Sequence, residues 1–145
     1  MRGGHAIENH SYRHQHNFSL LGLGGLRREI AQAQLVLAQA SGTAPRFFRA
    51  PAGLRNPLLD VVLQRLGLQL TSWTRRGFDT VSTDTASVVA RLTRNLRAGD
   101  ILLLHDGHAA RSPGGTPIVL EVLPRVLEAI AQRSLRAVTL REALQ

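Results

Sequence analysis

Residues 101–107 read ILLLHDG, an apolar run that ends abruptly in polar residues. Ile101–Leu104 predicts a buried strand, since a short continuous apolar run suits a strand better than a longer helix. Burying His105 or Asp106 without a partner would cost free energy. We therefore interpret both residues as functional groups at the end of a strand.

The same order of strand and helix repeats on both sides of this stretch. Further strands are predicted at His5–Glu8, Arg46–Arg49, Leu68–Trp73 and Arg136–Thr139. Helices are predicted at Gly24–Ala40, Pro57–Leu66, Thr85–Arg97 and Pro117–Arg133, with a closing helical turn at Leu140–Leu144. Pro124 should kink the helix that contains it. The alternation predicts an α/β protein with a parallel sheet or barrel.

In such folds, functional groups gather at the carboxyl ends of the strands. The polar and aromatic residues that follow predicted strands are His10, His14, Arg49, Trp73, Asp79, His105 and Asp106. The spacing of His10 and His14 places both imidazoles on one face of a helical turn. Imidazole suits Zn²⁺ and related ions, although two exposed histidines remain the alternative interpretation.

Composition excludes some functional classes. A length of 145 residues predicts a single domain with one core over residues 1–145. The net charge of +8 raises the possibility of nucleic-acid binding. However, the 18 basic residues are all arginine and are spread along the chain, and the sequence has one Trp and one Tyr for stacking. We expect no nucleic-acid partner, and no apolar run in this chain is long enough for a membrane segment.

The stretch from Gly4 to His14, GHAIENHSYRH, resembles the His-Ser/Thr-x-x-His motif of the polysaccharide deacetylase family, the NodB-homology domain of carbohydrate esterase family 4. Both motif histidines bind the metal ion in that family. The resemblance therefore implies that His10 and His14 bind a divalent metal, with Zn²⁺ the expected ion. It also implies that Ser11 steadies the loop.

Residues 49–53, RAPAG, resemble a second motif of the family, Arg-x-Pro-Tyr/Phe-Gly. The resemblance implies that Arg49 orients the catalytic carboxylate and that Pro51 and Gly53 contribute to substrate binding. Ala52 stands where the family has an aromatic residue that lines the substrate groove, which leaves the choice of substrate open.

Residues 73–79, WTRRGFD, resemble a motif in which a tryptophan precedes acidic residues. The resemblance implies that Asp79 tunes the catalytic histidine and that Trp73 lines the groove, although Trp73 is equally interpreted as a core residue. Arg76 departs from the motif, because an aspartate is common there.

Residues 102–106, LLLHD, resemble the family motif Leu-x-Leu-His-Asp. The resemblance implies that His105 is the general acid that protonates the leaving amine. It also implies that the neighbouring leucines, Leu103 among them, hold the acetyl methyl group.

A Thr-Phe-Asp-Asp-Gly motif, which supplies the general base and a third metal ligand in the family, is absent from the sequence. We therefore expect the C-terminal part of a longer deacetylase, with poor metal affinity and little or no activity by itself. The expected fold is an incomplete NodB-like distorted (β/α) barrel of parallel strands that lacks its first strand or strands. Its exposed edge could support self-association.

The resemblance predicts a metal-dependent polysaccharide deacetylase, a hydrolase of carbon–nitrogen bonds other than peptide bonds. Its substrate would be an acetylated polysaccharide such as a chitin-like oligosaccharide or peptidoglycan. The alternative is a non-catalytic remnant of the fold that binds glycans without a metal. The sequence predicts no cellular compartment.

Overall fold

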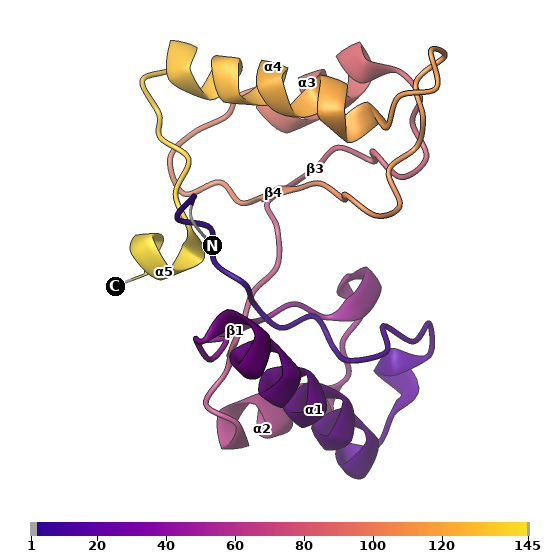
Figure 1. Cartoon of the computed structure of the whole chain (residues 1–145), viewed down its shortest axis with the longest axis vertical. Helices are drawn as coiled ribbons and strands as arrows, with labels where there is room; N and C mark the ends of the chain where they lie inside the picture. The colour runs from indigo at the N-terminus through magenta and orange to yellow at the C-terminus, as the bar shows by residue number, and fades with distance from the viewer. Residues whose placement is uncertain (1–2, 145) are drawn as a thin grey trace. The chain divides into compact units, whose positions relative to one another are not determined.

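A computed structural model describes residues 3–144, and the chain divides into two compact units (Figure 1). The first unit comprises Met1–Ser72 and Val138–Gln145, and the second comprises Trp73–Ala137. Each unit has its own cluster of buried apolar residues, so the described chain has two clusters instead of the single core that its length predicts. The assignment of one partial domain to residues 1–145 stays a prediction.

The first unit contains a two-stranded parallel sheet and two α-helices that pack on each other. Its elements are η1 (Phe18–Leu20), α1 (Leu23–Ser41), β1 (Phe47–Phe48), η2 (Pro51–Gly53), α2 (Pro57–Arg65), β2 (Gln69–Leu70) and α5 (Leu140–Ala143). Phe47 pairs with Gln69 and Phe48 with Leu70. Asn9 forms an isolated parallel bridge with Phe48, whereas the strand expected at His5–Glu8 is wrong, because these residues form neither strand nor bridge.

The limits of α1 and α2 follow from local sequence. Gly42, at φ 71°, ends α1 in the left-handed conformation that glycine adopts readily, and its N–H donates to the carbonyl of Ala38. Asn56 caps α2 by accepting the N–H of Leu58 at 3.0 Å, and Pro57 occupies the first helical position. Both helices therefore begin and end close to where the sequence predicts.

An ion pair binds the C-terminal segment to the rest of the first unit. Arg141 of α5 binds Glu8 with 2.6 Å between Nε and Oε1, and Glu8 also accepts the backbone N–H groups of Arg46 and Phe47. The predicted strand Arg136–Thr139 is wrong, because these residues pair with no strand and the Thr139 hydroxyl caps α5 instead.

The second unit contains a second parallel sheet and two helices. Its elements are β3 (Arg75–Arg76), α3 (Thr85–Thr93), β4 (Leu102–Leu103) and α4 (Ile118–Gln132). The helices pack through the cluster Val88, Leu92, Ile118, Val122 and Val126. Helix α3 is shorter than predicted, because Asn95 adopts a φ of 57° just after its end. Helix α4 continues through Pro124, and the expected kink stays a prediction.

Strand β3 lies in a stretch for which the sequence predicts no strand, and a partly buried ion pair ties it to the residue before Ile101. Arg75 Nε lies 2.6 Å from Asp100 Oδ2, next to the start of β4. Burial raises the pKa of Asp100, but hydrogen bonds from the Arg97 N–H, Arg75 and Thr74 outweigh it and hold the pKa at about 2. An arginine that looks like a surface residue in the sequence thus joins the sheet.

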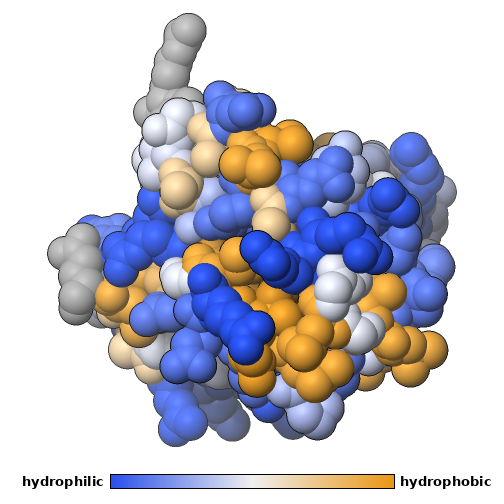
Figure 2. Space-filling model, turned by 90° about the horizontal axis from the view of Figure 1, so that it is seen from below, coloured by the Kyte–Doolittle hydropathy of each residue, from blue (hydrophilic) through white to orange (hydrophobic). Residues whose placement is uncertain are grey.

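Both sheets are parallel, which confirms the predicted α/β class. Within residues 3–144 no helix combines the length and apolar character needed to cross a bilayer. Figure 2 shows apolar residues bordered by hydrophilic ones on one face of the molecule. The most exposed large apolar side chains include Leu20, Leu35, Val81 and Leu120. Self-association through an exposed edge stays a prediction.

Candidate functional site

The two motif histidines lie in a loop that follows the Asn9 bridge. Their rings meet edge to face with centroids 4.7 Å apart, and His10 Nε2 lies 3.2 Å from His14 Nε2. The predicted helical turn is wrong, because Ser11 and His14 adopt positive φ angles of 69° and 51°. The loop nevertheless brings the two imidazoles together, as the prediction of a shared site requires.

A backbone carbonyl orients the first of these rings. His10 Nδ1 lies 2.7 Å from the carbonyl oxygen of Arg49. Since a carbonyl only accepts, Nδ1 must carry the proton, and the lone pair of the neutral ring is then on Nε2, the atom that faces His14. Metal-binding histidines commonly show such a hydrogen bond on the other ring nitrogen.

Hydrogen bonds of the Asn9 and Ser11 side chains constrain the loop. The buried Asn9 side chain donates to the carbonyl of Ile30 at 3.0 Å and to Gln34 Oε1 at 2.8 Å, and it accepts the Ser11 N–H at 3.0 Å. The Ser11 hydroxyl accepts the N–H of His14 at 3.1 Å. This geometry suits the loop-steadying role that the resemblance implies for Ser11. Sequence reasoning missed Asn9, although its position next to His10 was a signal.

The spacing of the histidine nitrogens fits two ligands of one ion. Two nitrogens bound to Zn²⁺ at about 2.0–2.1 Å are about 3.3 Å apart at the tetrahedral angle. The observed distance is 3.2 Å, and both side chains are exposed to an incoming ion. No cluster of three or more His, Cys, Asp or Glu that could hold an ion occurs in residues 3–144. The described part of the chain therefore offers this pair of histidines as candidate ligands.

Arg49, whose carbonyl contacts His10, also has an unsatisfied side-chain donor. Its Nε is buried and has no hydrogen-bond partner within the described residues, and burial lowers the pKa of Arg49. Buried donors are normally satisfied, so this atom suits an acceptor such as a carboxylate. Pro51 is buried, and the half-buried Gly53 adopts a φ of 73° at the end of η2. Ala52 is exposed, so the position of the missing aromatic faces outward.

The second unit contains the other two predicted catalytic residues, and these bind each other. Asp79 is fully buried; its Oδ2 accepts the backbone N–H of His105 at 2.6 Å, and its Oδ1 lies 3.0 Å from His105 Nδ1. Oδ1 accepts from Nδ1, so this contact holds the proton on Nδ1 and orients the ring. The His105 side chain remains 34% exposed. Its Nε2 is thus the ring nitrogen available to another partner.

Close packing positions the Asp79 loop. A side chain on Gly77 would place its Cβ 2.8 Å from a methyl carbon of Val88, so this position requires glycine. Phe78 follows at a φ of 59°, and the carbonyl of Asp79 accepts the N–H of Ala110 at 2.7 Å. Sequence reasoning missed the need for Gly77, which only the packing against α3 reveals.

The remaining predicted site residues have different environments. Trp73 is half-buried, with the Arg76 guanidinium 5.9 Å from its ring centroid. Leu103 is 6% exposed and is thus largely enclosed by protein. Asp106 is exposed and accepts the N–H of Gly107 at 2.7 Å.

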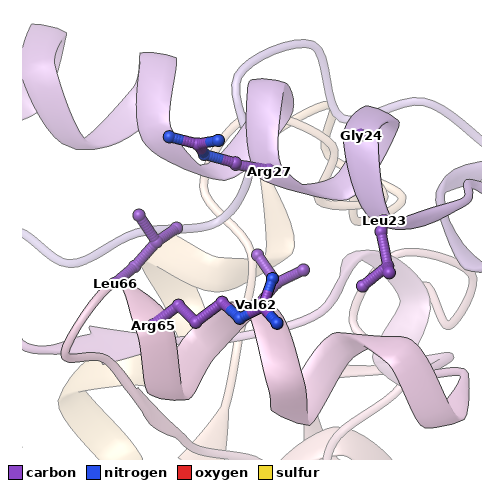
Figure 3. A pocket seen from close by; sticks show the side chains of 6 residues that line it. All are labelled: Leu23, Gly24, Arg27, Val62, Arg65 and Leu66. Atoms are coloured by element: carbon purple, nitrogen blue, oxygen red, sulfur yellow. The ribbon is translucent and has the colours of Figure 1, made fainter.

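A cavity of about 400 Å³ lies between α1 and α2 (Figure 3). Leu23, Gly24, Arg27, Val62, Arg65 and Leu66 line it. None of the predicted site residues is among them, so the cavity is separate from the histidine pair and from Arg49.

Comparison with known proteins identifies relatives of the chain. Residues 1–71 match the family model described as polysaccharide deacetylase. A chitooligosaccharide deacetylase of Azorhizobium caulinodans is 32% identical over 105 residues, which are 72% of this chain and 50% of that relative. The chain thus spans about half the length of this curated relative.

Two solved structures share the fold. A family 4 carbohydrate esterase from Streptomyces lividans in complex with acetate is 30% identical, with a TM-score of 0.79 over 90% of this chain and 63% of that one. A family 4 acetyl xylan esterase from Clostridium thermocellum in complex with a cobalt ion is 28% identical. Its TM-score is 0.80 over 97% of this chain and 64% of that one.

Proposed function

The chain belongs to the polysaccharide deacetylase family, and from this premise we propose that it is part of a metal-dependent hydrolase that removes acetyl groups from a glycan. The expected incomplete NodB-like fold is confirmed, because most of this chain matches somewhat less than two thirds of the related esterase structures. The reaction, the substrate and the roles of the residues are proposals.

The observation that carries the proposal is the convergence of two imidazole nitrogens, 3.2 Å apart, with one ring oriented by a backbone carbonyl. We assign His10 and His14 to a divalent ion, with Zn²⁺ the expected choice. The cobalt ion in the related esterase supports a divalent metal. Such an ion would act as a Lewis acid on the acetyl carbonyl.

We assign the role of general acid to His105. The hydrogen bond from Nδ1 to Asp79 keeps the ring in one orientation, so protonated Nε2 can deliver its proton to the departing amine. Asp79 also accepts the backbone N–H of His105, so one carboxylate holds both the main chain and the ring. This double contact supports a positioning role for Asp79.

We assign Arg49 to the positioning of a carboxylate. Its buried Nε has no partner within residues 3–144, and a carboxylate would satisfy it with a charge-assisted hydrogen bond. In the family this partner is the general base of the Thr-Phe-Asp-Asp-Gly motif, which the sequence lacks. A carboxylate from such a motif would satisfy Arg49 Nε in the proposed reaction.

The proposed substrate is an acetylated polysaccharide. The relatives support this class, since one deacetylates chitooligosaccharide and another is an acetyl xylan esterase. Trp73, Pro51 and Gly53 stay candidates for substrate contact. Leu103 stays a candidate for the acetyl methyl group, although it is largely enclosed.

Metal titration tests the central assignment. Calorimetry with Zn²⁺ and with Co²⁺ should show one weak site in the wild-type chain, and H10A and H14A should each abolish it, because a single imidazole is a poor ligand. His16→Ala removes an exposed histidine of the same unit and is the matched control. Equal binding by all three variants would exclude the histidine pair as the site.

Acetate release tests the reaction. Extending the chain at its N-terminus with a segment that carries the Thr-Phe-Asp-Asp-Gly motif should produce metal-dependent release of acetate from acetylated chitooligosaccharide. The same protein with H105A should release far less, since the acid for the leaving amine is gone. No release by the extended protein, despite metal binding, would contradict the deacetylase proposal.

The small number of candidate metal ligands supports a second candidate function. In it, the chain is a non-catalytic remnant of the fold that binds glycans. The described residues supply two metal ligands and no carboxylate on Arg49 Nε. This candidate predicts oligosaccharide binding that persists after treatment with a metal chelator, whereas the deacetylase proposal predicts that acetate release requires the metal.

A further inference from the structure

Helix α1 buries a carboxylate in its apolar face. Its buried residues are Leu26, Glu29, Ile30 and Ala33, the i, i+3, i+4, i+7 spacing of a face that packs on a core. Glu29 is only 7% exposed. Burying a carboxylate is costly, and an apolar residue of the same length would suit this face better if packing were the only requirement. The contacts of Glu29 therefore need an explanation beyond packing.

The principal contact of Glu29 is with the loop that contains the two histidines. Its Oε2 accepts the backbone N–H of Arg13 at 2.9 Å. The contact between its Oε1 and Arg13 Nε is loose, at 3.6 Å, and the Arg13 side chain is 64% exposed. Exposed ion pairs of this kind contribute little. The bond to the main chain is thus the stronger constraint, and it acts on the residue directly before His14.

The loop needs constraints, because its backbone is strained. Ser11 and His14 both adopt positive φ angles, which non-glycine residues hold only when surrounding groups enforce them. Asn9 accepts the N–H of Ser11, and Ser11 accepts the N–H of His14. Glu29 accepts the N–H between these two, so consecutive parts of the loop are held by different side chains.

We propose that Glu29 is a positioning residue for the histidine pair: its buried carboxylate holds the Arg13 N–H and thereby keeps His14 Nε2 next to His10 Nε2. The consequence for metal affinity rests on the proposed function, whereas the consequence for the distance between the two rings does not. Glu29 lies 15 residues from His14 and in none of the motifs that the sequence suggests.

The test uses Glu29→Met in the full chain. Methionine fills the same space without an acceptor, so the urea midpoint of unfolding should be unchanged or higher, while Zn²⁺ affinity falls by about 10- to 100-fold, as is typical when an outer contact of a metal ligand is lost. Glu29→Gln keeps an oxygen that can accept the Arg13 N–H and should retain most of the affinity. Arg13→Ala keeps the backbone N–H and is the matched control; its affinity should match wild type.

Magnetic resonance supplies a readout that needs no metal. In wild type, nuclear Overhauser effects should join the rings of His10 and His14, and E29M should lose them while E29Q keeps them. If the wild type shows the ring contacts but binds neither Zn²⁺ nor Co²⁺, the metal assignment is wrong and the role of Glu29 is still supported. If E29M keeps both the ring contacts and the metal affinity of wild type, the proposal for Glu29 is wrong.

Discussion

Replacing Asp79 by asparagine should change which nitrogen of the neutral His105 ring carries the proton. The carboxylate now accepts two N–H groups, one from the His105 backbone at 2.6 Å and one from ring Nδ1 at 3.0 Å. An asparagine side chain has a single acceptor oxygen. The backbone N–H cannot lose its proton, so the oxygen should face the backbone and the amide nitrogen should face the ring. Nδ1 must then accept, and the proton moves to Nε2.

The energetic cost follows from the number and charge of these bonds. A hydrogen bond to a charged group contributes about 1.5–3 kcal/mol, and a neutral one about 0.5–1.5 kcal/mol. Converting both bonds of the buried Asp79 to neutral ones should lower the free energy of unfolding by about 2 kcal/mol. D79A removes both bonds and should cost about 4 kcal/mol. Asp106→Asn changes an exposed carboxylate in the next position after His105 and should cost less than about 0.5 kcal/mol.

Urea denaturation measures the stability of these variants, and ¹⁵N spectra of the His105 ring identify the protonated nitrogen. Wild type should carry the proton on Nδ1 in the neutral ring, and D79N should carry it on Nε2. Two results together would refute the reasoning: a D79N ring still protonated on Nδ1, and a free energy of unfolding within 0.5 kcal/mol of wild type. Asp79 would then have no hold on the ring.

Three further changes test the packing at Gly77, the partly buried ion pair of Asp100 and the attachment of the C-terminal segment. Gly77→Ala places a methyl group 2.8 Å from a core valine and should destabilise the protein by about 1–3 kcal/mol in urea titrations, whereas Gly114→Ala, with no atom closer than 3.9 Å, should not. The pKa of Asp100 is about 2 when folded and 3.8 in its ordinary state, so its contribution to stability is present above about 3.8 and is lost as the pH falls towards 2. Asp100→Asn should flatten that part of a stability–pH profile, and an unchanged slope would contradict the assigned pKa. Arg141→Ala removes the ion pair to Glu8 and should cost about 1–2 kcal/mol and speed amide exchange in α5; equal exchange would show that α5 is held by other contacts.

Local signals predicted the helices well. Asn56 followed by a proline marks the start of one helix, and Gly42 after an amphipathic run marks the end of another. Each signal acts on neighbouring residues, so the sequence alone predicts its effect. The strands were less predictable. The structure contains two-residue strands, and β3 consists of two arginines, of which Arg75 binds Asp100, a residue 25 positions away.

The contacts between site residues were also only partly predictable from the sequence. The spacing of His10 and His14 correctly brought two imidazoles together, but the loop that joins them is not helical. The contact between Asp79 and His105 spans 26 residues, and the resemblance to known motifs, rather than any periodicity, pointed to it. Glu29 escaped prediction because a glutamate in a helix is ordinary in a sequence, and only its burial shows that it is not.

The sequence by itself indicated the family and the α/β alternation, and it singled out His10 and His14. Motifs, caps and apolar periodicity are local properties of the chain, so they can be recognised without the structure. The tertiary structure decided what the local pattern leaves open: which acceptor orients His10, how Asp79 binds both the main chain and the ring of His105, and that Glu29 is buried. These features depend on contacts between residues far apart in the chain. Only folding brings these partners together, so no local pattern can encode the contacts.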